Sequence, residues 1–113
     1  MELKKLYVDL SVLLGREIPI YAFLLYADMC ARTLLCRYPK KLLLPVGEYT
    51  SPESLLDALP IDEAFYNALL YAIAGSAGGE ENYTKKSDAA AEEAYRTLWR
   101  VHARGKRRKG DAW

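Results

Sequence analysis

The sequence predicts an all-α protein: a small bundle of about four helices, with an extended arm or short hairpin between the second and third long helices and a flexible basic C-terminal tail. Two observations carry this prediction. Apolar residues recur at the helical period in four separate segments, and prolines or glycines stand where those segments stop. The length of 113 residues is typical of a single domain.

The first helix is expected to occupy residues 3–14. Its apolar positions form one stripe, and Gly15 can adopt the left-handed conformation that closes a helix. The stripe consists of Leu3, Leu6, Tyr7, Leu10, Leu13 and Leu14.

A second helix is expected within residues 17–38. Pro19 suits the first turn of a helix, and Tyr38 is disfavoured in the helical region because Pro39 follows it. The segment is apolar on most sides as far as Ala27. Such a helix either lies centrally in the fold or also packs against a partner.

Residues 40–50 are expected to form the extended arm or hairpin, because Pro45 and Gly47 interrupt their apolar run. The arm must bury its apolar side chains, either by folding back on the bundle or by packing against another subunit. Both alternatives stay open from the sequence. The side chains concerned are Leu42, Leu43, Leu44 and Val46.

A helix of one or two turns is expected after the arm. Ser51 is a good N-cap, and Pro52 would occupy the first helical position. The pair Leu59-Pro60 would end this short helix.

The third long helix is expected within residues 60–79. Asp62 and Glu63 favour its N-terminus because negative charge complements the helix dipole there. Gly75, Gly78 and Gly79 are expected to break the helix into a loop. Two stripes follow its axis: an apolar one of Phe65, Leu69 and Ile73, and a small-residue one of Ala64, Ala68, Ala72 and Ser76 that would let another helix approach closely.

The last helix is expected from about Lys86 to Ala103, with Gly105 ending it. Glu92 and Arg96 are four residues apart in the favourable order, with the acidic residue first. The apolar seam of this helix consists of Ala91, Ala94, Tyr95, Leu98, Val101 and His102.

Positive charge is concentrated at the C-terminal end of the chain. Seven basic residues and no acidic one lie between Arg96 and Lys109, whereas the whole chain has 16 basic and 15 acidic residues. The remainder therefore has 9 basic against 15 acidic residues, a net charge of −6. A basic tail can bind an acidic protein surface or nucleic acid, or can simply aid solubility.

No catalytic or metal-binding pattern is present, and we expect neither enzymatic activity nor a cofactor. His102 is the only histidine, and no serine or cysteine has a visible base partner. Cys30 and Cys36 lie on different faces of one helix, so they are expected to be free thiols. The longest apolar run has ten residues, too few for a membrane span. Asp9 interrupts the N-terminal apolar stretch, which is not typical of a signal peptide. A soluble, cytoplasmic protein is expected.

The order of these elements resembles the head–tail connector (head-completion adaptor) proteins of tailed bacteriophages. The second half carries the motifs: a Leu59-Pro60 pair, then Ala68-Leu69-Leu70-Tyr71-Ala72 in the following helix, then Ala94-Tyr95 with Leu98-Trp99. The first half is similar in layout, since a leucine-rich helix ends in "LLG" and a second helix ends in "RYP" before an extended segment.

The resemblance implies a virion structural protein, made in the host cytoplasm and placed at the head–tail junction. Copies would form a ring, expected to be dodecameric, which docks under the portal protein, extends the DNA channel and presents a surface to stopper or tail proteins. Residues 1–105 would be the connector domain and residues 106–113 its basic tail. The arm side chains Leu42, Leu43, Leu44 and Val46 would reach neighbouring subunits.

Docking to the portal, or contact with the packaged DNA, would fall to the C-terminal helix and tail. Trp113 could anchor a docked tail, because tryptophan is enriched among binding hot spots, or it could be a frayed terminal residue. The alternative function is a small basic helical protein that binds nucleic acid. The residues expected to act in either case are Arg100, Arg104, Lys106, Arg107, Arg108, Lys109 and Trp113.

Overall fold

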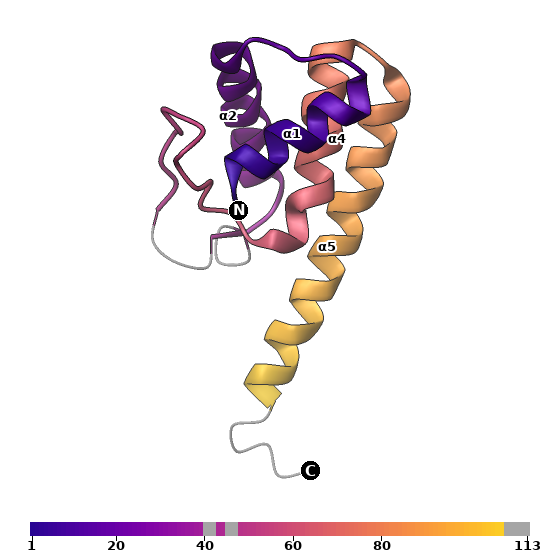
Figure 1. Cartoon of the computed structure of the whole chain (residues 1–113). Coiled ribbons are helices and arrows are strands. Elements are labelled where there is room, and N and C mark those ends of the chain that lie inside the picture. The colour runs from indigo at the N-terminus through magenta and orange to yellow at the C-terminus, as the bar shows by residue number, and fades with distance from the viewer. Residues whose placement is uncertain (40–42, 45–47, 108–113) are drawn as a thin grey trace.

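The protein is an all-α bundle, as the sequence predicts. The computed structural model describes residues 1–39, 43–44 and 48–107, with side chains as far as Val101. Its helices are α1 (Leu3–Leu14), α2 (Ile20–Arg37), α4 (Tyr66–Gly78) and α5 (Glu81–Arg107), and a short 3-10 helix, η1 (Glu63–Phe65), leads into α4. Figure 1 shows α4 in the middle of the body, with α1 and α2 on one side and α5 on the other.

The first helix has the limits and the buried face that its leucine periodicity predicts. Leu3, Leu6 and Leu10 are buried. Gly15 has a φ of 70° and closes the helix through its amide, which donates to the carbonyl of Val12. A residue with a side chain would be strained in this conformation, so glycine is the residue that ends α1 cleanly.

The second helix begins after Pro19 and ends before Tyr38, as expected from the two prolines. One face of α2 is buried, and the opposite face is open to solvent. The exposed face carries Tyr21, Leu25 and Met29, which are four residues apart and between 53% and 77% exposed. The buried residues of α2 are Phe23, Ala27, Cys30, Ala31 and Leu34.

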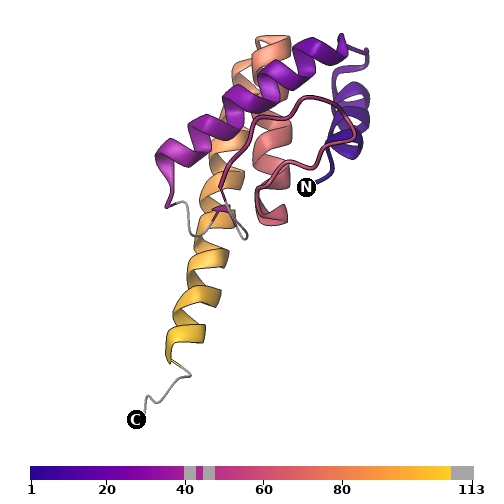
Figure 2. The same cartoon turned by 90° about the vertical axis from the view of Figure 1, so that its left-hand side faces the viewer.

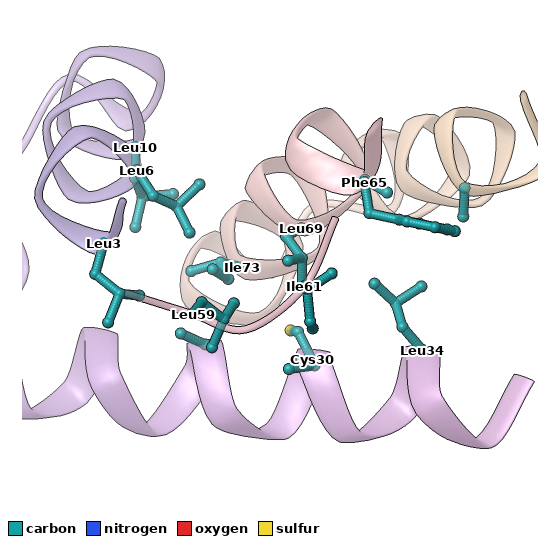
Figure 3. Packing of buried hydrophobic residues seen from close by; sticks show 14 of the residues in the cluster. Leu3, Leu6, Leu10, Cys30, Leu34, Leu59, Ile61, Phe65, Leu69 and Ile73 are labelled. Atoms are coloured by element: carbon teal, nitrogen blue, oxygen red, sulfur yellow. The ribbon is translucent and has the colours of Figure 1, made fainter. Parts of the chain in front are cut away.

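The core lies where α1, α2 and α4 meet. Figure 3 shows the leucines of α1, residues Leu59 and Ile61, and the inner face of α2 all pointing toward α4. The predicted apolar stripe of the third long helix is confirmed, because Phe65, Leu69 and Ile73 are fully buried. The Asp62 carboxylate caps the start of this segment by accepting from the Ala64 amide at 2.8 Å.

The small-residue stripe predicted for α4 is wrong in part, because Ala64 and Ser76 are exposed. Residues four apart drift by about 40° per step around a helix, so a stripe of three such steps cannot stay against one neighbour. The close approach to α5 instead uses Ala68 and Gly75, which are seven residues apart. A Cβ added at Gly75 would lie 3.1 Å from Thr84 Oγ1, and the Ser87 hydroxyl donates to the Ala68 carbonyl at 2.7 Å.

The last helix is longer at both ends than the sequence predicts. It begins at Glu81 instead of Lys86 and continues through Gly105 to Arg107. The early start follows from packing, since the ring of Tyr83 stacks on Tyr71 of α4 with 6.2 Å between centroids. The predicted glycine loop is therefore only the turn at Gly79, which has a φ of 70°.

The arm after α2 folds back on the bundle at Leu43. This side chain is fully buried in the core, and its carbonyl accepts from the Asp62 amide at 2.7 Å. Leu44 is half-buried, while Leu42 and Val46 lie outside the described residues. Within the described part of the chain no strand forms, and the only extended pairing is a bridge between Glu2 and Ala58.

The short helix predicted after the arm is replaced by a single turn at residues 54–57. The Asp57 amide donates to the Ser54 carbonyl at 3.1 Å. The Asp57 carboxylate accepts from the amides of Glu53 and Ser54 at 2.9 and 3.1 Å. These bonds close the turn locally. The chain then pairs with the N-terminus, through the bridge between Ala58 and Glu2 and the bond from the Leu59 amide to the Met1 carbonyl, so no longer helix forms. Ser51, the expected N-cap, makes a different contact.

Ser51 and Tyr49 fasten the loop to α2 through Asp28. Both hydroxyls donate to the Asp28 carboxylate, at 2.8 and 2.6 Å, and Arg32 forms an ion pair with it at 3.1 Å. Although partial burial acts in the opposite direction, the hydrogen bonds from Tyr49, Ser51 and Arg32 lower the pKa of Asp28 below its usual value. Burial, and then the bond to Asp28, raise the pKa of Tyr49.

Candidate functional site

The projecting end of α5 is the most distinctive surface feature of the molecule. Figures 1 and 2 show this helix leaving the body and continuing well past the other helices. A helix of 27 residues is about 40 Å long. It accounts for the elongated shape of the protein, whose principal extents are 55 × 28 × 22 Å.

The body holds α5 through polar and aromatic contacts at Asp88, Glu92 and Tyr95, and Leu98 also packs against the core. The Arg37 guanidinium pairs with Asp88 at 2.9 Å, and the Tyr38 hydroxyl donates to Glu92 at 3.0 Å. The rings of Tyr38 and Tyr95 lie 4.9 Å apart. All three contacts come from the C-terminal end of α2, so this end of α2 marks where the body stops supporting α5.

The apolar seam of α5 continues past this point and becomes steadily more exposed. Ala91 is fully buried and Ala94 is 6% exposed, whereas Leu98 is half-buried. Val101 is next in the series and is 62% exposed. Val101 thus belongs to the predicted seam by its spacing but not by its burial, because none of the other described helices covers α5 there. His102, the last predicted member, lies outside the residues whose side chains are described.

Two arginines lie on a different face of α5 from the seam, since the helical period places Arg96 well over a third of a turn from both Leu98 and Val101. Arg96 and Arg100 are exposed and occupy successive turns of α5, and the Trp99 side chain between them is 48% exposed. The sequence has no acidic residue between Glu93 and Asp111. Two exposed guanidinium groups on one face of a helix suit a partner surface that offers carboxylates or phosphates.

The other predicted site residues follow Val101 in the sequence. Arg104, Lys106 and Arg107 lie within α5, beyond the residues whose side chains are described. Arg108, Lys109 and Trp113 lie outside the described residues altogether. We define the projecting end as residues 96–107, and its described side chains are those of residues 96–101.

The perturbed titratable groups in the described part of the chain link elements of the fold. Tyr66 of α4 donates to Asp9 of α1, and burial followed by this bond raises the pKa of Tyr66. Burial also raises the pKa of the Cys30 thiol.

Both cysteines are free thiols, as predicted, with Cys30 buried and Cys36 exposed. Among residues with described side chains, no group of three or more histidine, cysteine, aspartate or glutamate residues could hold a metal ion.

Two features of the surface were missed by reasoning from the sequence. We call Asp28, Arg32, Tyr49 and Ser51 the Asp28 cluster. It joins Asp28 to residues more than twenty positions away, and no local pattern reveals this. Leu56 was assigned to a short helix, but it lies on the turn at residues 54–57 and is 92% exposed. The capping pair of Ser54 and Asp57, three residues apart, was the available signal for this turn.

Comparison with protein-family models, with curated proteins and with solved structures finds no match to this chain. None of the helices in the described residues is long and apolar enough to cross a membrane.

Proposed function

We propose that the protein is a virion structural protein, a head–tail connector whose copies form a ring under the portal of a tailed bacteriophage. The observation that carries the proposal is the projecting end of α5, with exposed Arg96, Arg100 and Val101 beyond a small folded body. The order of elements expected from the resemblance, with two helices, an irregular arm and two further helices, supports the same function.

The projecting end suits docking to a larger protein. A rigid helix that is already formed loses less conformational freedom on binding than a disordered peptide does. Its exposed Val101 and Trp99 offer apolar surface, and its arginines can form bidentate hydrogen bonds with carboxylates. In the proposed ring, the projecting ends of all copies bind the portal together, so that many weak contacts add up to a stable joint.

The basic charge of the same segment also favours a second candidate, binding of nucleic acid. Arginines along one helix can contact several phosphates, and such binding falls steeply as salt concentration rises. In the connector, these charges serve either the portal surface or the DNA that passes through the channel. The two candidates therefore differ in whether the protein alone binds DNA tightly.

Co-purification with the portal protein encoded in the same genome tests the proposal. We expect the full-length chain to form a stable complex, and we expect both Arg100→Glu and a chain ending at Ala103 to weaken it. Lys85→Glu is the matched control, because Lys85 is exposed near the opposite end of the same helix. This control variant should bind like the unmodified chain.

A salt titration of binding to duplex DNA, with the same four proteins, separates the two candidates. Feeble binding by the full-length chain, near a dissociation constant of about 10⁻⁴ M at physiological salt, agrees with the connector. Tight binding that disappears in the chain ending at Ala103, together with no portal complex, would replace the connector by the nucleic-acid-binding protein.

A further inference from the structure

The turn at residues 54–57 presents a leucine to solvent on a rigid support. Leu56 is 92% exposed, more than any other exposed large hydrophobic side chain among the described residues. Its amide donates to the Ser54 hydroxyl at 3.2 Å, and the Asp57 carboxylate holds the amides of Glu53 and Ser54. Three hydrogen bonds thus fix a turn whose leucine contributes nothing to the core of its own chain.

The surroundings of Leu56 are acidic. Glu48, Glu53 and Asp57 are exposed in the same loop. From residue 42 to residue 84 the chain has seven acidic residues and no basic one, and from residue 96 to residue 109 it has seven basic residues and no acidic one. We call Glu53, Leu56 and Asp57 the acidic knob.

The acidic knob and the projecting end of α5 are complementary in charge and both are partly apolar. Exposed Arg96 and Arg100 lie on one face of α5 and match the carboxylates, and the half-exposed Trp99 side chain between them matches Leu56. Within one molecule they lie apart: Figure 1 shows the loop at the left edge of the body, whereas the projecting end of α5 extends away below the body. Figure 2, seen from the loop side, shows the loop in front of α4 with α5 behind.

We infer that the acidic knob of one copy binds the projecting end of α5 of a second copy. Because the two surfaces differ, this contact is head-to-tail and leaves a pair of copies with one unused knob and one unused projecting end. Such a contact either closes into a ring or continues as a filament. The inference rests on the proposed function, since it names the surfaces that meet between neighbours in the proposed ring. The neighbour contacts the face of α5 that carries Arg96 and Arg100, and the portal contacts the other faces of the projecting end.

The contact is small, so a single pair of copies associates weakly and the oligomer grows with protein concentration. Because exposed charges flank it, we expect association to weaken as salt concentration rises. The loop that carries the acidic knob is held on α2 near its start, because the hydroxyls of Tyr49 and Ser51 donate to the Asp28 carboxylate.

Sedimentation velocity over a range of protein and salt concentrations tests the inference. Leu56→Asp should weaken self-association about tenfold, the size of effect typical of a central apolar contact. Its folding should be unchanged because Leu56 is exposed. Val12→Asp is the matched control on α1, where Val12 is 78% exposed, and it should associate like the unmodified chain.

An exchange of charges gives the sharper test. Glu53→Arg alone places an arginine against Arg100 of the neighbour, and Arg100→Glu alone places a glutamate against Glu53, so each variant should be largely monomeric. A mixture of the two should associate again, because each contact in an alternating assembly then joins opposite charges. Loss in each variant with recovery in the mixture is the expected result.

Self-association that neither Leu56→Asp nor the charge variants change would overturn the inference while leaving the proposed ring in place, built on other surfaces. A chain that stays monomeric at every concentration and low salt would overturn the inference too. The connector function itself fails only if the portal complex is also absent, which the co-purification measures separately.

Discussion

The two halves of α5 share one helix and one seam pattern but differ in what lies opposite them. In the first half the seam faces α4, and Ala91 is fully buried. In the second half the same seam reaches Val101, which is 62% exposed because the body has ended. Burial is therefore set by the neighbouring element and not by periodicity alone. A seam that continues past its support is surface available to another molecule.

The halves also differ in how their charges are used. In the first half, Asp88 and Glu92 bind Arg37 and Tyr38 and hold the helix on the body. In the projecting end, Arg96 and Arg100 are exposed on successive turns, and no acidic residue follows them in the sequence until Asp111. Acidic side chains thus support the fold, while the basic ones are available for binding.

The largest loss of stability is expected when the body loses a central side chain. Phe65 is fully buried and packs beside Tyr38, with 5.8 Å between ring centroids. Phe65→Ala should reduce the free energy of unfolding by about 3–5 kcal/mol through lost burial and a cavity. Urea unfolding followed by circular dichroism measures the change, and a loss below about 1 kcal/mol would contradict the core described here.

A somewhat smaller loss is expected where α4 and α5 approach most closely. Ala68 is 1% exposed beside Ser87, so Ala68→Leu should destabilise the protein by about 1–3 kcal/mol through overpacking. Ala89→Leu introduces the same side chain at an exposed position of α5 and should change little. Equal unfolding curves for the two variants would mean that Ala68 faces solvent.

The fastening of the loop at Asp28 should make stability depend on acid pH. The pKa of Asp28 is lowered in the folded protein, so its contribution is present above the ordinary aspartate pKa, near 4, and is lost as pH falls through the folded value. Asp28→Asn should remove this dependence, at a loss of up to about 1 kcal/mol at neutral pH.

Thermal unfolding between neutral and acid pH measures the effect. Glu48→Gln serves as the control, since Glu48 is an exposed carboxylate of the same loop. An unchanged pH profile in Asp28→Asn would show that the cluster contributes nothing to stability.

The smallest effect is expected in the projecting end itself. Val101→Ser should change the free energy of unfolding by less than about 0.5 kcal/mol, because the side chain is already exposed. Deleting residues 106–113 is likewise expected to leave the helical fold intact. A large drop in melting temperature for either variant would mean that this region supports the body.

Much of the fold could be predicted because it follows local rules. The stripe of α1 ends at Gly15, α2 lies between Pro19 and Tyr38, and the acidic start of the third long helix is a true cap. The start of α5 could not be predicted, since residues 81–86 are mostly polar and are helical through the packing of Tyr83 on Tyr71.

The candidate site could be predicted only in outline. Charge segregation pointed to the C-terminal segment, but the sequence does not show that α5 leaves the body after Tyr95, because that depends on where α2 ends in space. The single turn that carries Leu56 differs from the predicted helix because Ala58 and Leu59 pair with Glu2 and Met1, a contact between distant residues that the local sequence does not show.

Hydrogen exchange measured by mass spectrometry, on the protein alone and in complex with the portal protein, tests the central claim most directly. The account predicts that residues 96–107 exchange faster than the rest of α5 in the free protein and become protected in the complex, while the core of α1, α2 and α4 is unchanged. Protection confined to the body, with residues 96–107 still exchanging freely in the complex, would contradict the claim that the projecting end of α5 is the docking element.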